Sequence, residues 1–98
     1  MHVISRRALV DFWTRHPQAQ APMAAWFKVV SGATFTKFAD VKQTFNSADR
    51  VGEFVVFDVG ARDRIVTVIQ FNRGRMYLRR VLTHREYDQW TSGQRGKR

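Results

Sequence analysis

The sequence predicts an α+β fold in which two or three amino-terminal helices pack on one face of a small antiparallel sheet and a short helix follows the last strand. Three observations favour this class. Apolar residues recur at helical spacing up to about residue 45, three runs rich in β-branched and aromatic residues follow, and a helix-capping motif stands after the last run. Helices first and strands after are typical of α+β domains, whose amphipathic helices cover one sheet face. The other face is expected to be partly open.

The first half of the chain predicts a brief strand at residues 1–4 and then three helices. Ser5 is expected to cap the first helix, which ends near residue 16 because Pro17 disfavours helical geometry in the residue before it. A second helix follows the turn and reaches about Val30. Thr36 is expected to cap a third, short helix. The aromatic residues of the first two helices are assigned to the core: Phe12, Trp13, Trp26 and Phe27.

The second half predicts an antiparallel meander of strands at residues 54–59, 65–71 and 75–82, joined by turns at 60–63 and 72–74. Side chains alternate between the two faces of a strand. In the last strand, one face is expected to hold Met76, Leu78 and Leu82 and the other Arg75, Tyr77 and Arg79, with Arg80 interrupting the apolar face.

The residues after this strand carry a capping box. The Thr83 hydroxyl can accept from the amide of Glu86, while the Glu86 carboxylate reaches back to the amide of Thr83. Leu82 before the cap and Tyr87 inside the helix have the spacing of a hydrophobic staple. A strand therefore runs directly into a helix, and this junction places His84, Arg85 and Tyr87 beside the arginines of the strand.

A chain of 98 residues suits one domain, and we expect a single domain over residues 1–98 with a mobile tail at 92–98. The 17 Lys and Arg residues outnumber the eight acids and give a net charge of +9. Most of the cations are arginines, whose planar guanidinium fits phosphate bidentately, so the composition favours a nucleic-acid partner. The alternative is a basic surface that confers solubility or binds an acidic protein.

Several classes of chemistry are disfavoured. The absence of cysteine excludes disulfides and thiolate metal sites, and the three histidines, His2, His16 and His84, lie far apart, so we expect no metal and no cofactor. No glycine-rich phosphate loop or nucleophile motif is present. The amino terminus lacks an apolar signal region and no window could span a membrane, so a cytoplasmic protein is expected. Metal-independent phosphate chemistry, or binding without chemistry, remains.

Seven arginines and one acid, Asp63, lie between residues 62 and 85. We expect the strands to bring these arginines into one neighbourhood, with about half of them solvated bystanders. They are Arg62, Arg64, Arg73, Arg75, Arg79, Arg80 and Arg85.

RNA can be cleaved by attack of its own 2′-hydroxyl on the adjacent phosphate, which requires a base, an acid and cations for the transition state. A histidine such as His84 can serve as acid or base near neutral pH, and Tyr87 can donate a proton or orient a group. Arg64 and Arg79 are expected to clamp phosphate in the catalytic set. The RNA-binding set comprises Arg62, Arg73, Arg75, Arg80 and Arg85. Taken alone, a histidine in the first turn of a helix is more often an ordinary surface residue.

Three segments resemble one family. They are Val-Ile-Ser-Arg-Arg-Ala-Leu at positions 3–9, followed by Phe12-Trp13 and His16-Pro17; Phe-Ala-Asp-Val-Lys at 38–42 with Phe45; and Val-Leu-Thr-His-Arg-Glu-Tyr-Asp at 81–88. In order and spacing they are similar to the HigB toxin family, which is related to RelE. The resemblance covers nearly the whole chain, through Asp88.

The resemblance implies a RelE-like α+β fold and a ribosome-dependent endoribonuclease that cuts messenger RNA during translation. It also implies restraint by a HigA-type helix-turn-helix antitoxin. Arg85 stands where lysine is more familiar in the family's closing motif, and Arg64 matches a basic position in its central hairpin. The assignment of acid and base rests on chemistry, because active residues differ among RelE relatives.

The sequence is also compatible with two other classes of function. A basic domain of this kind could occupy RNA, DNA or a ribosomal surface without catalysis. The related ParE-type toxins share this fold but poison gyrase, and fold alone does not separate these functions.

Overall fold

The structure, a computed structural model, describes residues 1–60 and 62–96. Its strands are β1 (His2–Ile4), β2 (Asp49–Val51), β3 (Phe54–Val59), β4 (Asp63–Gln70) and β5 (Arg75–Leu82). Its helices are α1 (Arg7–Arg15), α2 (Gln20–Gly32), α3 (Phe38–Thr44) and α4 (His84–Gly96), with single 3₁₀ turns at Pro17–Ala19 and Phe71–Arg73. The predicted α+β class is confirmed. No helix in this part of the chain is both long and apolar enough to cross a membrane.

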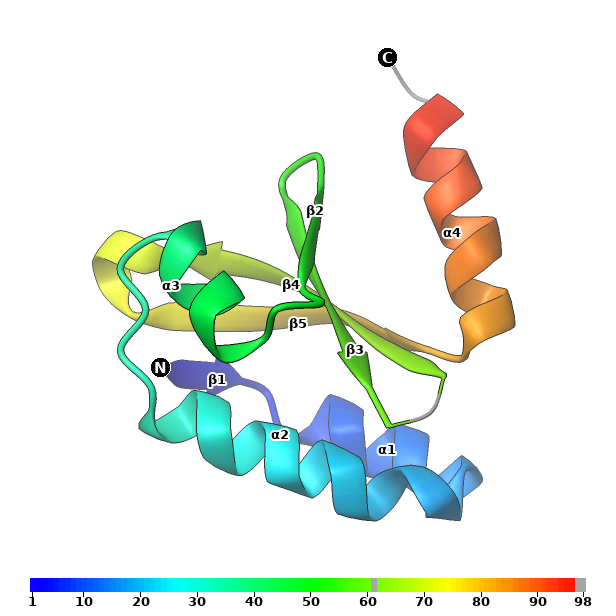
Figure 1. Ribbon diagram of the computed structural model, residues 1–98. Helices are drawn as coiled ribbons and strands as arrows, with labels where there is room; N and C mark the ends of the chain where they lie inside the picture. The colour runs from blue at the N-terminus through cyan, green and yellow to red at the C-terminus, as the bar shows by residue number, and fades with distance from the viewer. Residues whose placement is uncertain (61, 97–98) are drawn as a thin grey trace.

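The five strands form one sheet in the order β1-β5-β4-β3-β2. The predicted meander of β3, β4 and β5 is confirmed, and β2 extends it through a hairpin with β3. The prediction of a wholly antiparallel sheet is wrong, because β1 pairs in parallel with β5, with His2 opposite Arg75. The helical segment between β1 and β2 carries the chain across the sheet, which brings the first strand to the edge farthest from β2 (Figure 1).

The helices α1 and α2 lie against one face of the sheet, while α4 and the β2–β3 hairpin rise on the opposite side (Figure 1). Phe57 of β3 is fully buried between the rings of Trp26 and Phe45, each 5.2 Å away in an edge-to-face arrangement. Of the aromatic residues assigned to the core, Phe12 and Trp26 are buried. Trp13 and Phe27 are only half-buried, under the guanidinium of Arg6.

Two predicted helix caps are wrong. The N-cap of α1 is Arg6 rather than Ser5, and no side chain caps that helix. The N-cap of α3 is Lys37. Thr36 instead donates from its amide and its hydroxyl to the Asp40 carboxylate, both at 2.8 Å, and these hydrogen bonds lower the pKa of Asp40. The acid in the first turn therefore accepts the bonds, which is the reverse of the predicted cap.

A β-bulge in β5 changes which residues share a face. Val66 pairs with Arg80 and Thr67 pairs with Leu78, so Arg79 is the extra residue on β5. Before the bulge, Leu78 packs against the helix-covered core, but Leu82 after it packs in a separate apolar cluster on the other face. The expectation that Leu82 shares a face with Leu78 is therefore wrong, because the extra residue shifts the alternation by one.

The capping box at the start of α4 is confirmed. The Thr83 amide donates to Glu86 Oε1 at 2.8 Å, and the Glu86 amide donates to Thr83 Oγ1 at 3.3 Å. The helix is longer than expected, because it includes residues 92–96, which the sequence assigned to a tail. Lys97 and Arg98 of that tail lie outside the described residues.

Candidate active site

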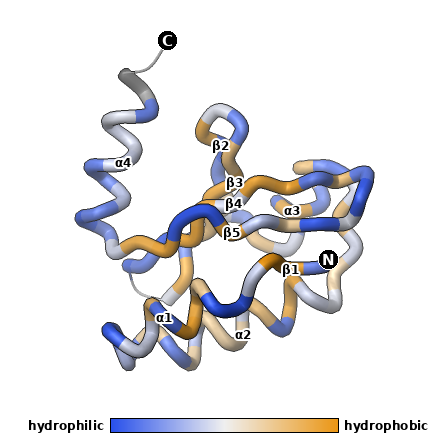
Figure 2. Tube along the Cα trace, turned by 180° about the vertical axis from the view of Figure 1, so that it is seen from behind, coloured by the Kyte–Doolittle hydropathy of each residue, from blue (hydrophilic) through white to orange (hydrophobic). Residues whose placement is uncertain are grey.

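The second apolar cluster attaches α4 to the sheet face that α1 and α2 leave uncovered. Its buried residues are Val51, Val56 and Val66, and the partly buried side chains packed against them are Phe54, Leu82, Tyr87 and Trp90. The hydroxyl of buried Thr91 donates to the Tyr87 carbonyl at 2.7 Å. Figure 2 shows that α4 is hydrophilic along most of its length. This helix is therefore held by a few inward side chains and presents the rest to solvent.

Arg64 and Tyr87 form a fixed pair on this face. The guanidinium of Arg64 lies 5.4 Å from the centre of the Tyr87 ring, within the range of cation–π contacts. Its Nε binds Asp58 Oδ1 at 2.8 Å across the β3–β4 pair, and its Nη1 donates to the Asp63 carbonyl at 3.1 Å. The Arg64 side chain is only 18% exposed. Arg64 therefore supports the ring of Tyr87. Because its guanidinium already binds Asp58 and the Asp63 carbonyl, little of it is free to bind phosphate.

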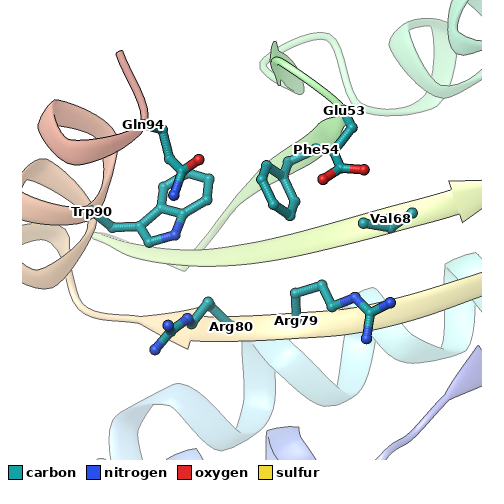
Figure 3. A pocket seen from close by; sticks show the side chains of 7 residues that line it. All are labelled: Glu53, Phe54, Val68, Arg79, Arg80, Trp90 and Gln94. Carbon is teal, nitrogen blue, oxygen red and sulfur yellow. The ribbon is translucent and has the colours of Figure 1, made fainter. Parts of the chain in front are cut away.

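Arg79 and Arg80 line one pocket on the same face. In a regular strand, consecutive residues point to opposite faces, and the bulge is what allows both arginines to reach this pocket. The pocket has a volume of about 480 Å³ and is lined by Glu53, Phe54, Val68, Arg79, Arg80, Trp90 and Gln94. Figure 3 shows these side chains around one space, contributed by the β2–β3 hairpin, β4, β5 and α4, with the guanidinium groups of Arg79 and Arg80 extending in opposite directions along β5. Arginines beside exposed aromatic rings are typical of single-stranded nucleic-acid sites.

His84 lies at the first position of α4 and pairs with Asp88 one turn later, with Nε2 3.4 Å from Oδ2. The side chain of His84 is 48% exposed and that of Asp88 is 62% exposed. The carboxylate of Asp88 lies on the Nε2 side of the ring, so Nδ1 is the ring nitrogen farther from it. A neighbouring pocket of about 390 Å³ is lined by Arg62, Asp63, Thr83, His84 and Arg85. This dyad can accept or donate a proton beside two arginines.

Two carboxyl groups near the start of α4 have shifted pKa values. The amide of Thr83 is the largest cause of the lowered pKa of Glu86, with smaller contributions from the Thr83 hydroxyl and from Arg15 and His16. Burial raises the pKa of Asp63, against the opposing effects of His16 and Arg64. The side chains of Arg15 and His16, where α1 ends, therefore favour the ionised form of these carboxyl groups.

The expectation that all seven arginines share one neighbourhood is wrong for Arg73 and Arg75. Arg75 begins β5 opposite Gln70 and His2, whereas Leu82 at the other end of β5 pairs with Arg64. At the rise of an extended strand, those ends are about 23 Å apart. The remaining five arginines lie around α4 in three adjoining groups: Arg64 with Tyr87, Arg79 with Arg80, and Arg62 with Arg85.

Several site residues were missed by the sequence interpretation: Glu53, Phe54, Asp58, Asp88, Trp90 and Gln94. Two signals could have found some of them. His84 and Asp88 have the i, i+4 spacing of helical neighbours. Gly52 and Glu53 between apolar residues form a two-residue hairpin loop, in which Gly52 has a φ of 60° and the flanking Val51 and Phe54 pair. The partners from distant segments had no local signal.

Comparison with known proteins identifies the family of this chain. The sequence pattern described as HigB toxin, RelE-like toxic component of a toxin–antitoxin system, matches residues 19–90. The mRNA interferase toxin HigB of Escherichia coli strain K12 is 33% identical over 101 residues, which cover 99% of this chain and 97% of that protein. The mRNA interferase HigB of Shigella flexneri has the same identity and coverage. The mRNA interferase HigB of Escherichia coli O6:H1 strain CFT073 is 23% identical over 95 residues, or 93% of this chain and 92% of that protein.

The match spans most of the chain, and the identity to two relatives extends over nearly its full length, in agreement with the resemblance found in the sequence. The chain belongs to the HigB toxin family, the RelE-like toxic components of toxin–antitoxin systems, and its partner is an antitoxin.

Proposed function

We propose that this toxin is an mRNA interferase, an endoribonuclease that cuts messenger RNA on the translating ribosome in the cytoplasm. The observation that carries the proposal is that the bulge brings Arg79 and Arg80 to one pocket beside Trp90. Tyr87 packs on the same sheet face, and His84 begins the helix that carries both aromatic residues. Cations, aromatic rings and proton-transfer groups then surround one helix. The relatives that are named mRNA interferases align over nearly the whole chain, which supports the same activity here.

The proposed step needs no metal. His84 Nδ1 takes the proton from the ribose 2′-hydroxyl, with Asp88 holding the imidazole, and the 2′-oxygen forms a bond to phosphorus as the bond to the 5′-oxygen breaks. Tyr87 gives its proton to the departing 5′-oxygen, and Arg79 and Arg80 bind the negative phosphate oxygens. The products are a 2′,3′-cyclic phosphate and a free 5′-hydroxyl. Charge therefore develops where the site supplies hydrogen-bond donors.

Mapping of RNA ends tests this proposal. Expression under tight control should produce new messenger RNA 5′-ends with free hydroxyls, and purified ribosomes programmed with a message should reproduce the same cuts. Two results would contradict it. Growth arrest with intact transcripts and altered supercoiling would favour the ParE-type activity, and inhibited translation without any cut would favour binding alone.

We also propose that the antitoxin is of the HigA type and that an acidic segment of it lies over Arg79 and Arg80. Both side chains are exposed and line a pocket, so carboxylates could occupy the place of RNA phosphates. The toxin–antitoxin Kd is expected to rise steeply with salt. Calorimetry at several salt concentrations, with charge reversal at Arg79 and Arg80, checks this. Affinity that is indifferent to both changes would overturn the placement.

A further inference from the structure

The pocket lined by Arg79 and Arg80 also contains a carboxylate, that of Glu53, which would repel a phosphate. Glu53 lines the pocket opposite the two arginines, but it forms no ion pair with either of them within 4.0 Å. The ion pairs among the side chains of residues 1–60 and 62–94 are Arg7 with Asp11, Arg64 with Asp58, and His84 with Asp88. Charges of opposite sign thus border one space without neutralising each other. A ligand that presents hydrogen-bond donors at one end and negative charge at the other would satisfy both.

The hairpin turn fixes where Glu53 stands. The loop between β2 and β3 has only two residues, Gly52 and Glu53, because Val51 and Phe54 already pair across the sheet. Gly52 has a positive φ, whereas no non-glycine residue in the described part of the chain does, which is the pattern of a type II′ turn. Such short turns match the twist of the flanking strands, so the turn sets the position of the Glu53 backbone, and the carboxylate lies at the rim of the pocket (Figure 3).

The aromatic side of the pocket provides a stacking surface. Phe54 and Trp90 meet edge to face, with ring centres 5.2 Å apart and planes at 73°. This perpendicular arrangement leaves ring faces directed away from the contact, and both residues line the pocket and are only partly buried. Stacking on an aromatic ring is the usual way in which proteins hold an unpaired RNA base. A volume of about 480 Å³ lies in the range of small-ligand sites, ~300–1,000 Å³.

We propose that this pocket binds one base of the messenger RNA and that Glu53 selects guanine there; the inference rests on the proposed nuclease function and specifies its substrate preference. The Watson–Crick edge of guanine carries two adjacent donors, N1–H and N2–H, which a carboxylate accepts bidentately. Cytosine and adenine offer a single exocyclic amino group at that edge. Gln94 from α4 lines the same pocket and can donate its amide to guanine O6, while Arg79 and Arg80 bind the flanking phosphates.

Titration with nucleotides measures base binding and base selectivity in the absence of RNA cleavage. Three tryptophan indole N–H signals report on the protein by NMR, and loss of one in Trp90→Phe assigns Trp90. GMP is expected to shift the Trp90 signal and bind at least about tenfold more tightly than AMP, CMP or UMP. The indoles of Trp13 and Trp26, on the helix-covered side, should not move. Glu53→Gln should abolish the preference, whereas Asp11→Asn, an equal charge change on exposed α1, should keep it.

Equal affinity for all four nucleotides would overturn base selection, and no shift at Trp90 at millimolar nucleotide would overturn the subsite itself. Cut sites mapped with the parent and with Glu53→Gln add an independent result. Enrichment of guanine at one position relative to the cut, lost in the variant, supports the proposal, and cleavage without any such enrichment counts against it. If the parent does not cut RNA at all, the nuclease function fails, while the titration still decides whether the pocket recognises guanine.

Discussion

His84→Ala is expected to slow RNA cleavage by about 10²–10⁴-fold while the fold and ribosome binding remain intact. Loss of a well-placed acid or base costs this much, because the 2′-hydroxyl must then lose its proton without help. The side chain is 48% exposed at the first position of α4, so its removal leaves no cavity in the core. Tyr87→Phe should slow cleavage in the same range, since it removes only the hydroxyl and keeps the ring against Arg64 and Trp90.

Single-turnover cleavage on programmed ribosomes, together with thermal melts and ribosome co-sedimentation, checks both variants. His2→Ala is the matched control, because His2 is exposed on β1 opposite Arg75, at the far end of β5 from the site. Asp88→Asn should lower the rate less than His84→Ala and change the pH–rate profile, since Asp88 acts only through the imidazole. Cleavage by His84→Ala at the parent rate would make His84 an ordinary surface residue and pass its role to Tyr87 or an arginine.

Arg64→Ala and Arg79→Ala are expected to fail in different ways, although both remove one arginine from the same face. Arg64→Ala leaves Asp58 without its partner at 2.8 Å and Tyr87 without the guanidinium beneath its ring. It should lower the free energy of unfolding by about 1–3 kcal/mol and slow the single-turnover rate. Arg79→Ala should preserve stability and weaken RNA binding, with the salt slope of binding reduced by about one.

Urea unfolding and the dependence of the cleavage rate on ribosome concentration separate the two effects. Arg64→Lys should not restore the rate, because an ammonium lacks the planar fork that binds Asp58 beside the Tyr87 ring. Arg7→Ala, an exposed arginine on α1, is the matched control for loss of one positive charge. If Arg64→Ala weakens binding and leaves both stability and the saturated rate unchanged, Arg64 contacts phosphate directly and its proposed support of Tyr87 is wrong.

Local sequence determined the elements whose limits are set by turn residues, proline or helix caps next to them in the chain. The limits of β3 and β5, the end of α1 before Pro17 and the capping box of Thr83 and Glu86 agree with the structure because each depends on neighbouring residues. The family resemblance depended on the same local segments and is confirmed. The length of α4 was underestimated, since its anchor Trp90 packs against residues of the sheet that are distant in sequence.

Only the tertiary structure decided how the site is assembled. The bulge that puts Arg79 and Arg80 on one face depends on pairing with β4, so strict alternation along β5 assigned Leu82 to the wrong face. Likewise, Asp58 pairs with Arg64 across two strands, and Glu53 of the β2–β3 loop lines the same pocket as Trp90 of α4, so no spacing along the chain reports these arrangements. The sequence determines which chemical groups are present, because composition and motifs are local. Which of them share a pocket follows from strand register and helix docking, because those are set by long-range packing.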